Sequence, residues 1–275
     1  MEWVERMNRM IGYIEENLDG EIDTDELSRL FLTPYAVIQR MFVPMTGIPL
    51  SEYVRRRRLS VAAQNLRETD MRVLDVAVKY GYESADAFSA AFRRLHGVSP
   101  QEARKPDVRL TFCPRMVFSM TITGGTEMNY KVVERDAFTV VGVRRTTPEA
   151  GGTWGIVKAD GSFERLAALT KDFGLGLGLC FGFDAQGNND YMCGVEYAGD
   201  PAAFEPFSYP RTTFLVFPAA GAISEGALGK AWKRVYGEFM PQSAYTQIDL
   251  PTIERYLLWD AEADRFEVEI MIPVK

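Results

Sequence analysis

Two glutamates in the second half of the sequence, Glu196 and Glu254, each lie in a run of residues predicted to form a strand. The same half contains large aromatic residues, among them Trp154, Tyr191, Tyr236, Tyr256 and Trp259. A carboxylate at the bottom of an aromatic-lined pocket can neutralise a lipophilic cation, which the ring faces also attract. These residues are therefore candidates for binding a small hydrophobic or cationic molecule. The alternative is that the glutamates point into solvent.

The elements that must position these residues begin near Met128, where a pattern of strands and helices occurs twice. The first round predicts a strand at 130–144, a helix within 161–173 and strands at 177–184 and 190–198. The second predicts a strand at 211–217, a helix within 226–239 and strands at 253–260 and 265–272. Two strand-helix-strand-strand halves predict an α+β domain with a pseudo-twofold axis and a cleft between the halves. Such a cleft is the default location of a small-molecule site.

The first hundred residues contain two helix-turn-helix patterns, of which the second is the clearer. Ala77 allows two helices to cross closely, Gly81 can adopt the left-handed conformation that ends the first helix, and Ser84 can cap the next. Phe88 and Phe92 are four residues apart and share the buried face of that second helix. The pattern predicts a recognition helix that begins after Ser84.

The earlier helix-turn-helix pattern runs from Leu27 to Phe42. Leu32 occupies the position of the expected turn glycine, while Thr33 and Pro34 indicate an N-cap followed by a proline at the first helical position. A long helix at 52–68 is predicted to join the two units, with inner positions at Tyr53, Leu59, Ala62, Ala63 and Leu66. Two recognition helices in tandem can enter successive turns of the major groove, about 34 Å apart.

The net charge of −7 argues at first against nucleic acid as a partner, because Lys and Arg carry phosphate binding. The charge is unevenly distributed, however. Residues 29–105 hold 13 Lys and Arg against 7 Asp and Glu, whereas residues 111–275 hold 15 against 21. We therefore expect any DNA-facing surface to be confined to the first domain. The sequence has no apolar run of about 18 residues and no signal-peptide pattern, so we expect a cytoplasmic protein without membrane contact.

The sequence contains no pattern that indicates a metal or a cofactor. Cys113, Cys180 and Cys193 are far apart and lack metal-ligand spacing, which favours a reducing compartment. The lone His96 has no ligand partners nearby and is expected to be a surface or capping residue. Glycines within 174–178 lack the strand-then-helix context of a dinucleotide loop. We expect no metal, no cofactor and no catalytic residue.

The first part of the chain resembles the AraC/XylS family of bacterial transcription regulators. The motifs at 53–59, 74–77, 81–84 and 97–100, with Phe88 and Phe92, carry the resemblance. Residues 191–196, 251–256 and 268–273 are similar to the GyrI-like effector-binding domain. The resemblance implies a multidomain protein. Its expected parts are an all-α DNA-binding domain with two helix-turn-helix motifs at 1–107, a semi-ordered linker at 108–127, and an α+β GyrI-like domain at 128–275.

The resemblance also implies which residues of the first recognition helix meet DNA. Its base-reading positions fall on Ala36, Gln39 and Arg40. Gln39 could pair with adenine, and Arg40 with guanine or a phosphate.

The second recognition helix departs from the family pattern, because Ala90 replaces a frequent arginine and Asp86 has the wrong charge for DNA. We therefore expect it to grip the backbone, through Ser84 and Arg93. In the arginine run on the joining helix, at most two side chains can reach one strand of phosphates, and Arg55 and Arg58 are the candidates. The alternative for this run is a solvated helix face.

The favoured hypothesis is a regulator that binds double-stranded promoter DNA through its first domain and a small effector through its second. A coupling of about 1–3 kcal/mol between the two ligands would suffice. We expect contact with RNA polymerase; one chain with two recognition units suffices as a monomer, and a homodimer is the alternative. A second hypothesis, taken from GyrI-like proteins that hydrolyse small molecules, makes Glu254 a general base. A third is a constitutive DNA-binding protein whose second domain contacts other proteins.

Overall fold

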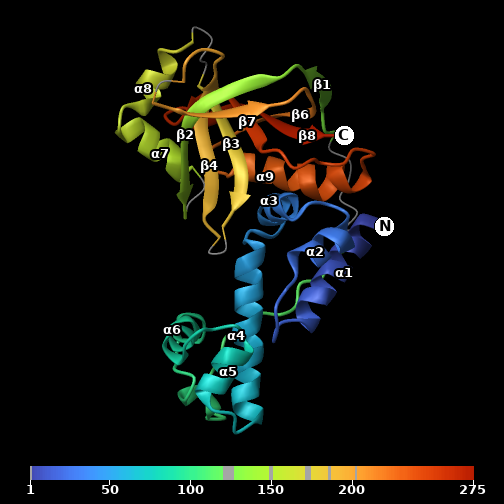
Figure 1. Cartoon of the computed structure of the whole chain (residues 1–275), viewed down its shortest axis with the longest axis vertical. Coiled ribbons are helices and arrows are strands. Elements are labelled where there is room, and N and C mark those ends of the chain that lie inside the picture. The colour runs from blue at the N-terminus through green and yellow to red at the C-terminus, as the bar shows by residue number, and fades with distance from the viewer. Residues whose placement is uncertain (1, 120–126, 149–150, 171–174, 185–186, 202) are drawn as a thin grey trace. The chain divides into compact units, whose positions relative to one another are not determined.

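The computed structural model describes residues 2–119, 127–148, 151–170, 175–184, 187–201 and 203–275 (Figure 1). The chain divides into two units. One consists of Met1–Leu32 with Leu50–Thr121, and the other of Thr33–Pro49 with Ile122–Lys275.

The first unit is helical, as the sequence predicts. Its elements are α1 (Glu2–Glu16), α2 (Thr24–Phe31), α4 (Leu50–Glu68), α5 (Val73–Lys79), α6 (Ala85–His96) and the short 3-10 helix η1 (Glu102–Arg104). The expected inner positions of α4 are all buried, and four of them form one core with Ala77, Phe88 and Phe92. The apolar spacing in the sequence therefore correctly predicted which helix faces are buried in this core.

The second helix-turn-helix motif consists of α5 and α6, and its local chemistry is confirmed. Gly81 has φ 79° in the turn, a conformation in which a side chain would be strained. Ser84 is the N-cap of α6 and accepts a hydrogen bond from the backbone N–H of Ala87 at 3.1 Å. Phe88 and Phe92 are fully buried.

The first motif differs in detail from the prediction. Leu32 ends α2 in the left-handed conformation with φ 57°, so a leucine takes the role expected of glycine. The N-cap of α3 (Tyr35–Thr46) is Pro34 and not Thr33, and no side chain caps this helix. Pro34 has φ −54°, which fits a helix, but its ψ of 141° is extended, so the helix begins one residue later than predicted.

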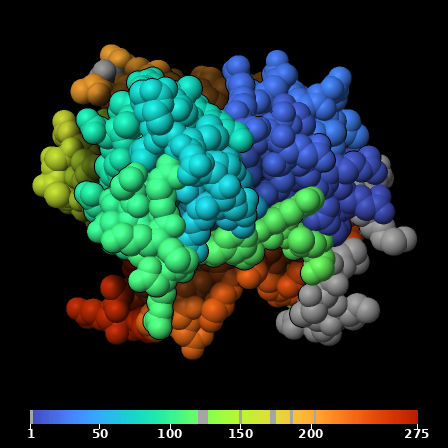
Figure 2. Space-filling model, turned by 90° about the horizontal axis from the view of Figure 1, so that it is seen from below, coloured from blue at the N-terminus to red at the C-terminus, as the bar shows by residue number. Residues whose placement is uncertain are grey.

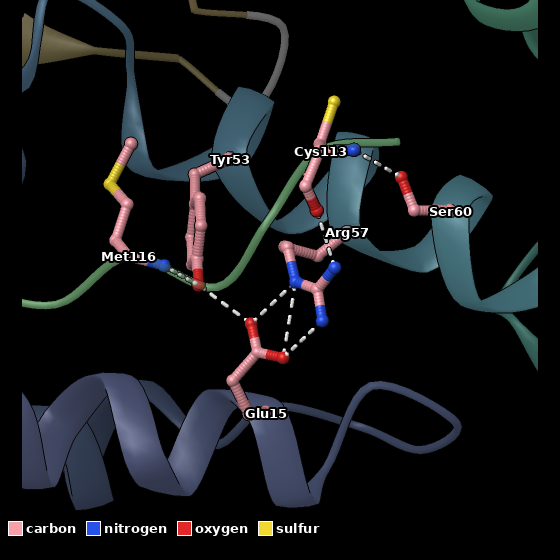
Figure 3. A network of polar contacts seen from close by, with 6 residues as sticks. All are labelled: Glu15, Tyr53, Arg57, Ser60, Cys113 and Met116. Atoms are coloured by element: carbon pink, nitrogen blue, oxygen red, sulfur yellow. Dashed lines mark hydrogen bonds and ion pairs between the residues drawn. The ribbon is translucent and has the colours of Figure 1, made fainter. Parts of the chain in front are cut away.

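A network of buried polar groups joins α1 to α4 (Figure 3). The Arg57 guanidinium donates to both carboxylate oxygens of Glu15, at 2.9 Å from Nε and 2.7 Å from Nη2. The Tyr53 hydroxyl donates to the same carboxylate at 2.6 Å. Burial acts to raise the pKa of Glu15, but the hydrogen bonds from Arg57 and Tyr53 outweigh it and the pKa is lowered.

Residues 108–127 were expected to form a semi-ordered linker, and residues 108–119 are tied to the first unit by hydrogen bonds. Arg57 donates to the Cys113 carbonyl, and the Cys113 N–H donates to Ser60 at 3.0 Å. The Asn8 side chain bonds both the N–H and the C=O of Phe118, at 2.9 and 2.8 Å. In Figure 2 the segment lies in light green against the dark-blue surface of α1. Residues 108–119 form no helix or strand, and side chains of the first unit bond several of their backbone groups.

His96 lies inside the first unit, which corrects the expectation of a surface or capping residue. Its side chain is buried, and Nε2 lies 3.2 Å from the carbonyl oxygen of Leu59. Its ring packs against Phe92 with centroids 4.2 Å apart. Burial lowers the pKa of the imidazole.

The second unit contains one eight-stranded antiparallel sheet in the order β1-β6-β8-β7-β3-β4-β2-β5. The strands of the first half are β1 (Lys131–Arg135), β2 (Phe138–Thr147), β3 (Leu177–Phe183) and β4 (Asn189–Glu196). Those of the second half are β5 (Glu205–Tyr209), β6 (Thr212–Gly221), β7 (Thr252–Asp260) and β8 (Arg265–Val274). Strands β1, β2, β3 and β4 correspond to β5, β6, β7 and β8. When each strand is replaced by its counterpart, the strand order is the same sequence read from the opposite edge of the sheet. The predicted repeat is therefore confirmed.

The predicted strand at 130–144 is in fact two strands, and β5 was not predicted. β1 pairs with β6 of the other half, while β5 pairs with β2, so each half gives an edge strand to the other. Helices α7 (Gly152–Ala159) and α8 (Ser162–Ala167) pack on the first half. In the second half, α9 (Ala227–Arg234) packs on β6 and continues into η2 (Val235–Phe239) and η3 (Met240–Gln242).

Helix α3, the predicted first recognition helix, also belongs to the second unit. It packs against β3, α9 and η2. This contact could not be anticipated from the sequence, because α3 and its nearest partner strand are separated by more than a hundred residues.

Candidate functional site

The centre of the second unit holds a carboxylate with three hydrogen-bond donors. Glu254 on β7 accepts at Oε2 from the hydroxyls of Tyr191 and Tyr256, at 2.6 and 2.7 Å. Its other oxygen, Oε1, accepts from the indole Nε1 of Trp232 at 2.7 Å. Hydrogen bonds to a charged acceptor are among the stronger ones in proteins, so the carboxylate is held in one orientation.

The register of three strands explains how Tyr191 reaches Glu254. Glu254 lies opposite Gly178 on the middle strand β3, and Gly178 in turn lies opposite Cys193, two residues along β4 from Tyr191. A Cβ atom at Gly178 would overlap the Tyr191 hydroxyl. Glycine at this position therefore provides the room for the tyrosine ring to cross the strand.

The two tyrosines remain protonated donors. Burial raises the pKa of Tyr191, and the neighbouring Glu254 charge raises it further. The same two causes raise the pKa of Tyr256. Both hydroxyls are therefore neutral at physiological pH and donate to the carboxylate.

A cavity of about 510 Å³ opens beside this cluster. Its lining includes Cys180, Tyr191, Trp232, Tyr236, Glu254, Tyr256 and Trp259. Trp232 was not among the residues predicted from the sequence, although it lies four residues before Tyr236 on a predicted helix. The two rings stack with centroids 5.6 Å apart. That spacing on one helix face was the signal that could have found it.

The structure brings together most of the predicted ligand-binding residues. Tyr191, Tyr236, Glu254, Tyr256 and Trp259 line the cavity. Trp154 lies at its side, where with Tyr256 and Trp259 it lines a smaller hollow of about 260 Å³. Its ring meets that of Tyr256 edge-on at 5.3 Å.

Glu196 is not part of the cavity, which corrects the prediction. Its exposed carboxylate pairs with Arg135 at 2.8 Å. Glu196 is five residues from Tyr191 on β4, so the alternation of a strand directs the two side chains to opposite faces.

Helix α3 also contributes to the cavity lining, with Arg40, Val43, Pro44 and Gly47. Arg40 is 4% exposed; its Nη1 donates to the Phe181 carbonyl at 2.9 Å and its Nη2 pairs with Asp249 at 3.0 Å. This placement differs from the expected one, in which Arg40 faces DNA. The expected base-reading residues Ala36 and Gln39 are partly exposed.

The candidate phosphate contacts of the first unit have different surroundings. Ser84 and Arg93 are exposed on α6, as are Asp86 and Ala90. Arg93 therefore has the exposure that contact with a phosphate requires.

The two candidates on α4 are held by neighbouring groups. Arg55 donates to Glu52 at 2.7 and 2.8 Å. Arg58 donates to the carbonyls of Leu18 and Gly20, at 3.0 and 2.6 Å, and burial lowers its pKa. The guanidinium of Arg58 thus binds the backbone that follows α1, whereas the sequence predicted a phosphate contact for it.

No cluster of residues suited to hold a metal ion occurs among the described residues. In the same part of the chain, no helix is long and apolar enough to cross a membrane.

Two families of known proteins match the two parts of the chain. Residues 28–106 match the helix-turn-helix domain family, and residues 128–275 match the GyrI-like small molecule binding domain family. The HTH-type transcriptional activator AarP of Providencia stuartii is 34% identical over 101 residues, which are 37% of this chain and 75% of AarP. Regulatory protein SoxS of Escherichia coli K12 is 35% identical over 95 residues, 34% of this chain and 89% of SoxS. The chain belongs to the AraC-type regulators with a GyrI-like domain.

Solved structures resemble the two domains of this regulator separately. SAV2435 bound to tetraphenylphosphonium is 24% identical, with a TM-score of 0.46 over 54% of the regulator and 94% of that chain. An AraC-type regulator from Chromobacterium violaceum is 23% identical, with a TM-score of 0.34 over 36% of the regulator and 89% of that chain. The family matches, and not these structural likenesses, show that the regulator combines a DNA-binding domain and a small-molecule binding domain in one polypeptide.

Proposed function

We propose that the effector of this regulator is a lipophilic cation bound in the 510 Å³ cavity, and that its binding alters promoter recognition. The observation that carries the proposal is the Glu254 carboxylate. Three donors fix it beside the cavity, and each of them belongs to an aromatic side chain.

The chemistry of the lining favours a cation over an anion or a sugar. A carboxylate supplies negative charge, and the faces of tryptophan and tyrosine rings attract cations in addition to apolar surface. The aromatic and aliphatic groups around Glu254 provide the apolar contact that a bulky organic cation requires.

Calorimetry with tetraphenylphosphonium tests the proposal. We expect Glu254→Gln to weaken binding about tenfold or more, because the substitution removes the charge and retains the shape. Glu196→Gln is the matched control, since it removes one negative charge from the same sheet outside the cavity, and it should bind as the wild type does. Triphenylphosphine oxide, which is neutral, should bind weakly to all three proteins. Equal affinity of wild type and Glu254→Gln for the cation would refute the proposal.

We propose further that the cavity binds its ligand without turnover. Glu254 already accepts three hydrogen bonds, so a water that it would activate as a general base must compete with them. The similarity to a small molecule binding family supports the same view. Steady accumulation of a hydrolysis product from reactive electrophilic ligands, abolished in Glu254→Gln, would establish an enzyme instead.

For DNA, we propose that α3 reads bases and α6 grips the backbone. Selection of bound fragments from bacterial genomic DNA with the full-length protein would identify the site. Arg93→Ala should weaken binding alike on all sequences and reduce the salt dependence by about one phosphate contact. Gln39→Ala should instead relax preference at one base pair, at a cost of about 1–3 kcal/mol.

Contact with RNA polymerase and action as a monomer are part of the same proposal. Two recognition units in one chain suffice for binding to successive grooves. A footprint that contains one site and a complex of one chain per DNA fragment would support a monomer, whereas two chains per fragment would establish the homodimer.

A further inference from the structure

The first recognition helix forms one wall of the effector cavity. Arg40, Val43, Pro44 and Gly47 of α3 line the same space as Glu254. The sequence predicts that α3 reads DNA, and in this structure α3 also closes the cavity. The same helix therefore has two possible partners, DNA and the effector.

Arg40 connects the two roles. Its guanidinium is enclosed by the Phe181 carbonyl and the Asp249 carboxylate, and its side chain is 3% exposed. Its Nε is buried and has no hydrogen-bond partner in the described part of the chain. An unpaired buried N–H group destabilises the arrangement that contains it, so the docked state of Arg40 is one that a modest perturbation can shift.

Docking and base reading are mutually exclusive for this side chain. A guanidinium that contacts a base edge or a phosphate must leave the Phe181 carbonyl and Asp249, because in the docked state the Arg40 side chain is only 3% exposed and cannot reach DNA. A DNA-bound regulator therefore has a cavity wall without the docked Arg40.

A cationic ligand in the cavity also disfavours the docked state of Arg40. Arg40 places a positive charge in the cavity wall, and this charge acts at Cys180 and Tyr236, where it opposes the increase in pKa caused by burial. A second positive charge in the same cavity is repelled by docked Arg40 and not by released Arg40.

We propose that Arg40 on α3 is part of the effector site and that a cationic occupant and docked Arg40 oppose each other, so that filling the cavity releases α3 to read DNA. The inference rests on the proposed function, because it takes a lipophilic cation as the ligand. By linkage, DNA and the cation must each strengthen the binding of the other by the same factor.

The test uses the full-length protein, tetraphenylphosphonium, and two variants matched in charge. Asp249→Asn removes the negative charge that pairs with Arg40 and leaves the cavity lining unchanged; the Asp249 side chain is 56% exposed, so folding is preserved. Glu205→Gln is the control, since Glu205 is 52% exposed in the same unit and is not part of the cavity lining. Hydrogen exchange of the amides in Tyr35–Thr46 reports release of α3, and those of Ala85–His96 on α6 serve as the reference.

Adding tetraphenylphosphonium to the wild type should accelerate exchange in α3 by about fivefold or more and leave α6 unchanged. Asp249→Asn should accelerate α3 exchange without ligand and should bind the cation several-fold more tightly than Glu205→Gln. Simple loss of a negative charge predicts weaker cation binding in both variants, so the direction of the change separates the two explanations.

The inference would be overturned if the cation left α3 exchange unchanged and bound Asp249→Asn and Glu205→Gln with equal affinity. If cation binding still depended on Glu254, the proposed function would remain intact. Absence of cation binding in every protein would overturn the proposed function, and the inference with it.

Discussion

The Tyr191 hydroxyl and the Glu254 carboxylate are joined by a 2.6 Å hydrogen bond, although their strands are not neighbours in the sheet. β3 lies between β4 and β7, and the bond crosses it at Gly178. Because β3 and β4 come from one half of the repeat and β7 from the other, this contact fixes the two halves against each other at the cavity.

Tyr191→Phe should weaken binding of tetraphenylphosphonium several-fold. The variant retains the ring but removes one donor from Oε2 of Glu254, so the carboxylate is less firmly held. Isothermal calorimetry measures the change. Tyr245→Phe is the control, because Tyr245 is not part of the cavity lining and should bind as the wild type does. A Tyr191→Phe variant with wild-type affinity would show that the orientation of the carboxylate does not limit binding.

Gly178→Ala should destabilise the second unit by about 1–3 kcal/mol and abolish cation binding, because the added methyl group overlaps Tyr191. Chemical denaturation and calorimetry measure the two effects. Gly155→Ala is the matched control. Gly155 lies within α7, and a Cβ atom added there would meet open space, so alanine should be neutral or slightly stabilising. Unchanged stability and binding in Gly178→Ala would contradict the close approach seen here.

Glu15→Gln should destabilise the first unit by about 3 kcal/mol, because it leaves the Arg57 guanidinium buried without its counter-ion. The pKa of Glu15 is below its ordinary value of 4.5, so its stabilising contribution is complete above that pH and is lost as the pH falls through the lowered pKa. From pH 7 to pH 3, the free energy of unfolding should therefore fall more steeply in the wild type than in Glu15→Gln. Denaturation curves at several pH values measure it. Glu16→Gln, at an exposed neighbouring position, should retain the wild-type curve.

His96→Gln should flatten the pH dependence of stability between pH 7.5 and pH 5.5. Burial lowers the pKa of His96 below its ordinary value of 6.5, so the unfolded chain binds the proton first as the pH falls. Wild-type stability is therefore complete above pH 6.5 and decreases below it. Urea denaturation at several pH values measures both slopes. Parallel curves for wild type and variant would show that His96 is not protonated on unfolding.

Short-range sequence signals predicted the helices and most strands. Gly81 and Ser84 mark the turn and cap of the second motif because their backbone requirements are local. The division of 130–144 into β1 and β2, by contrast, depends on pairing with β6 and β5, which are distant in the sequence. No local pattern of these residues carries that information.

The sequence by itself determined the two kinds of domain, the order of their elements and the presence of Glu254 among aromatic residues, because periodicity, capping and composition depend on near neighbours. Only the tertiary structure decided which side chains meet. It places Trp232 on Glu254, directs Glu196 to the other face of the sheet and buries Arg40 beside Asp249. These outcomes follow from strand register and from packing between distant segments, where a shift of one residue reverses the face of every side chain.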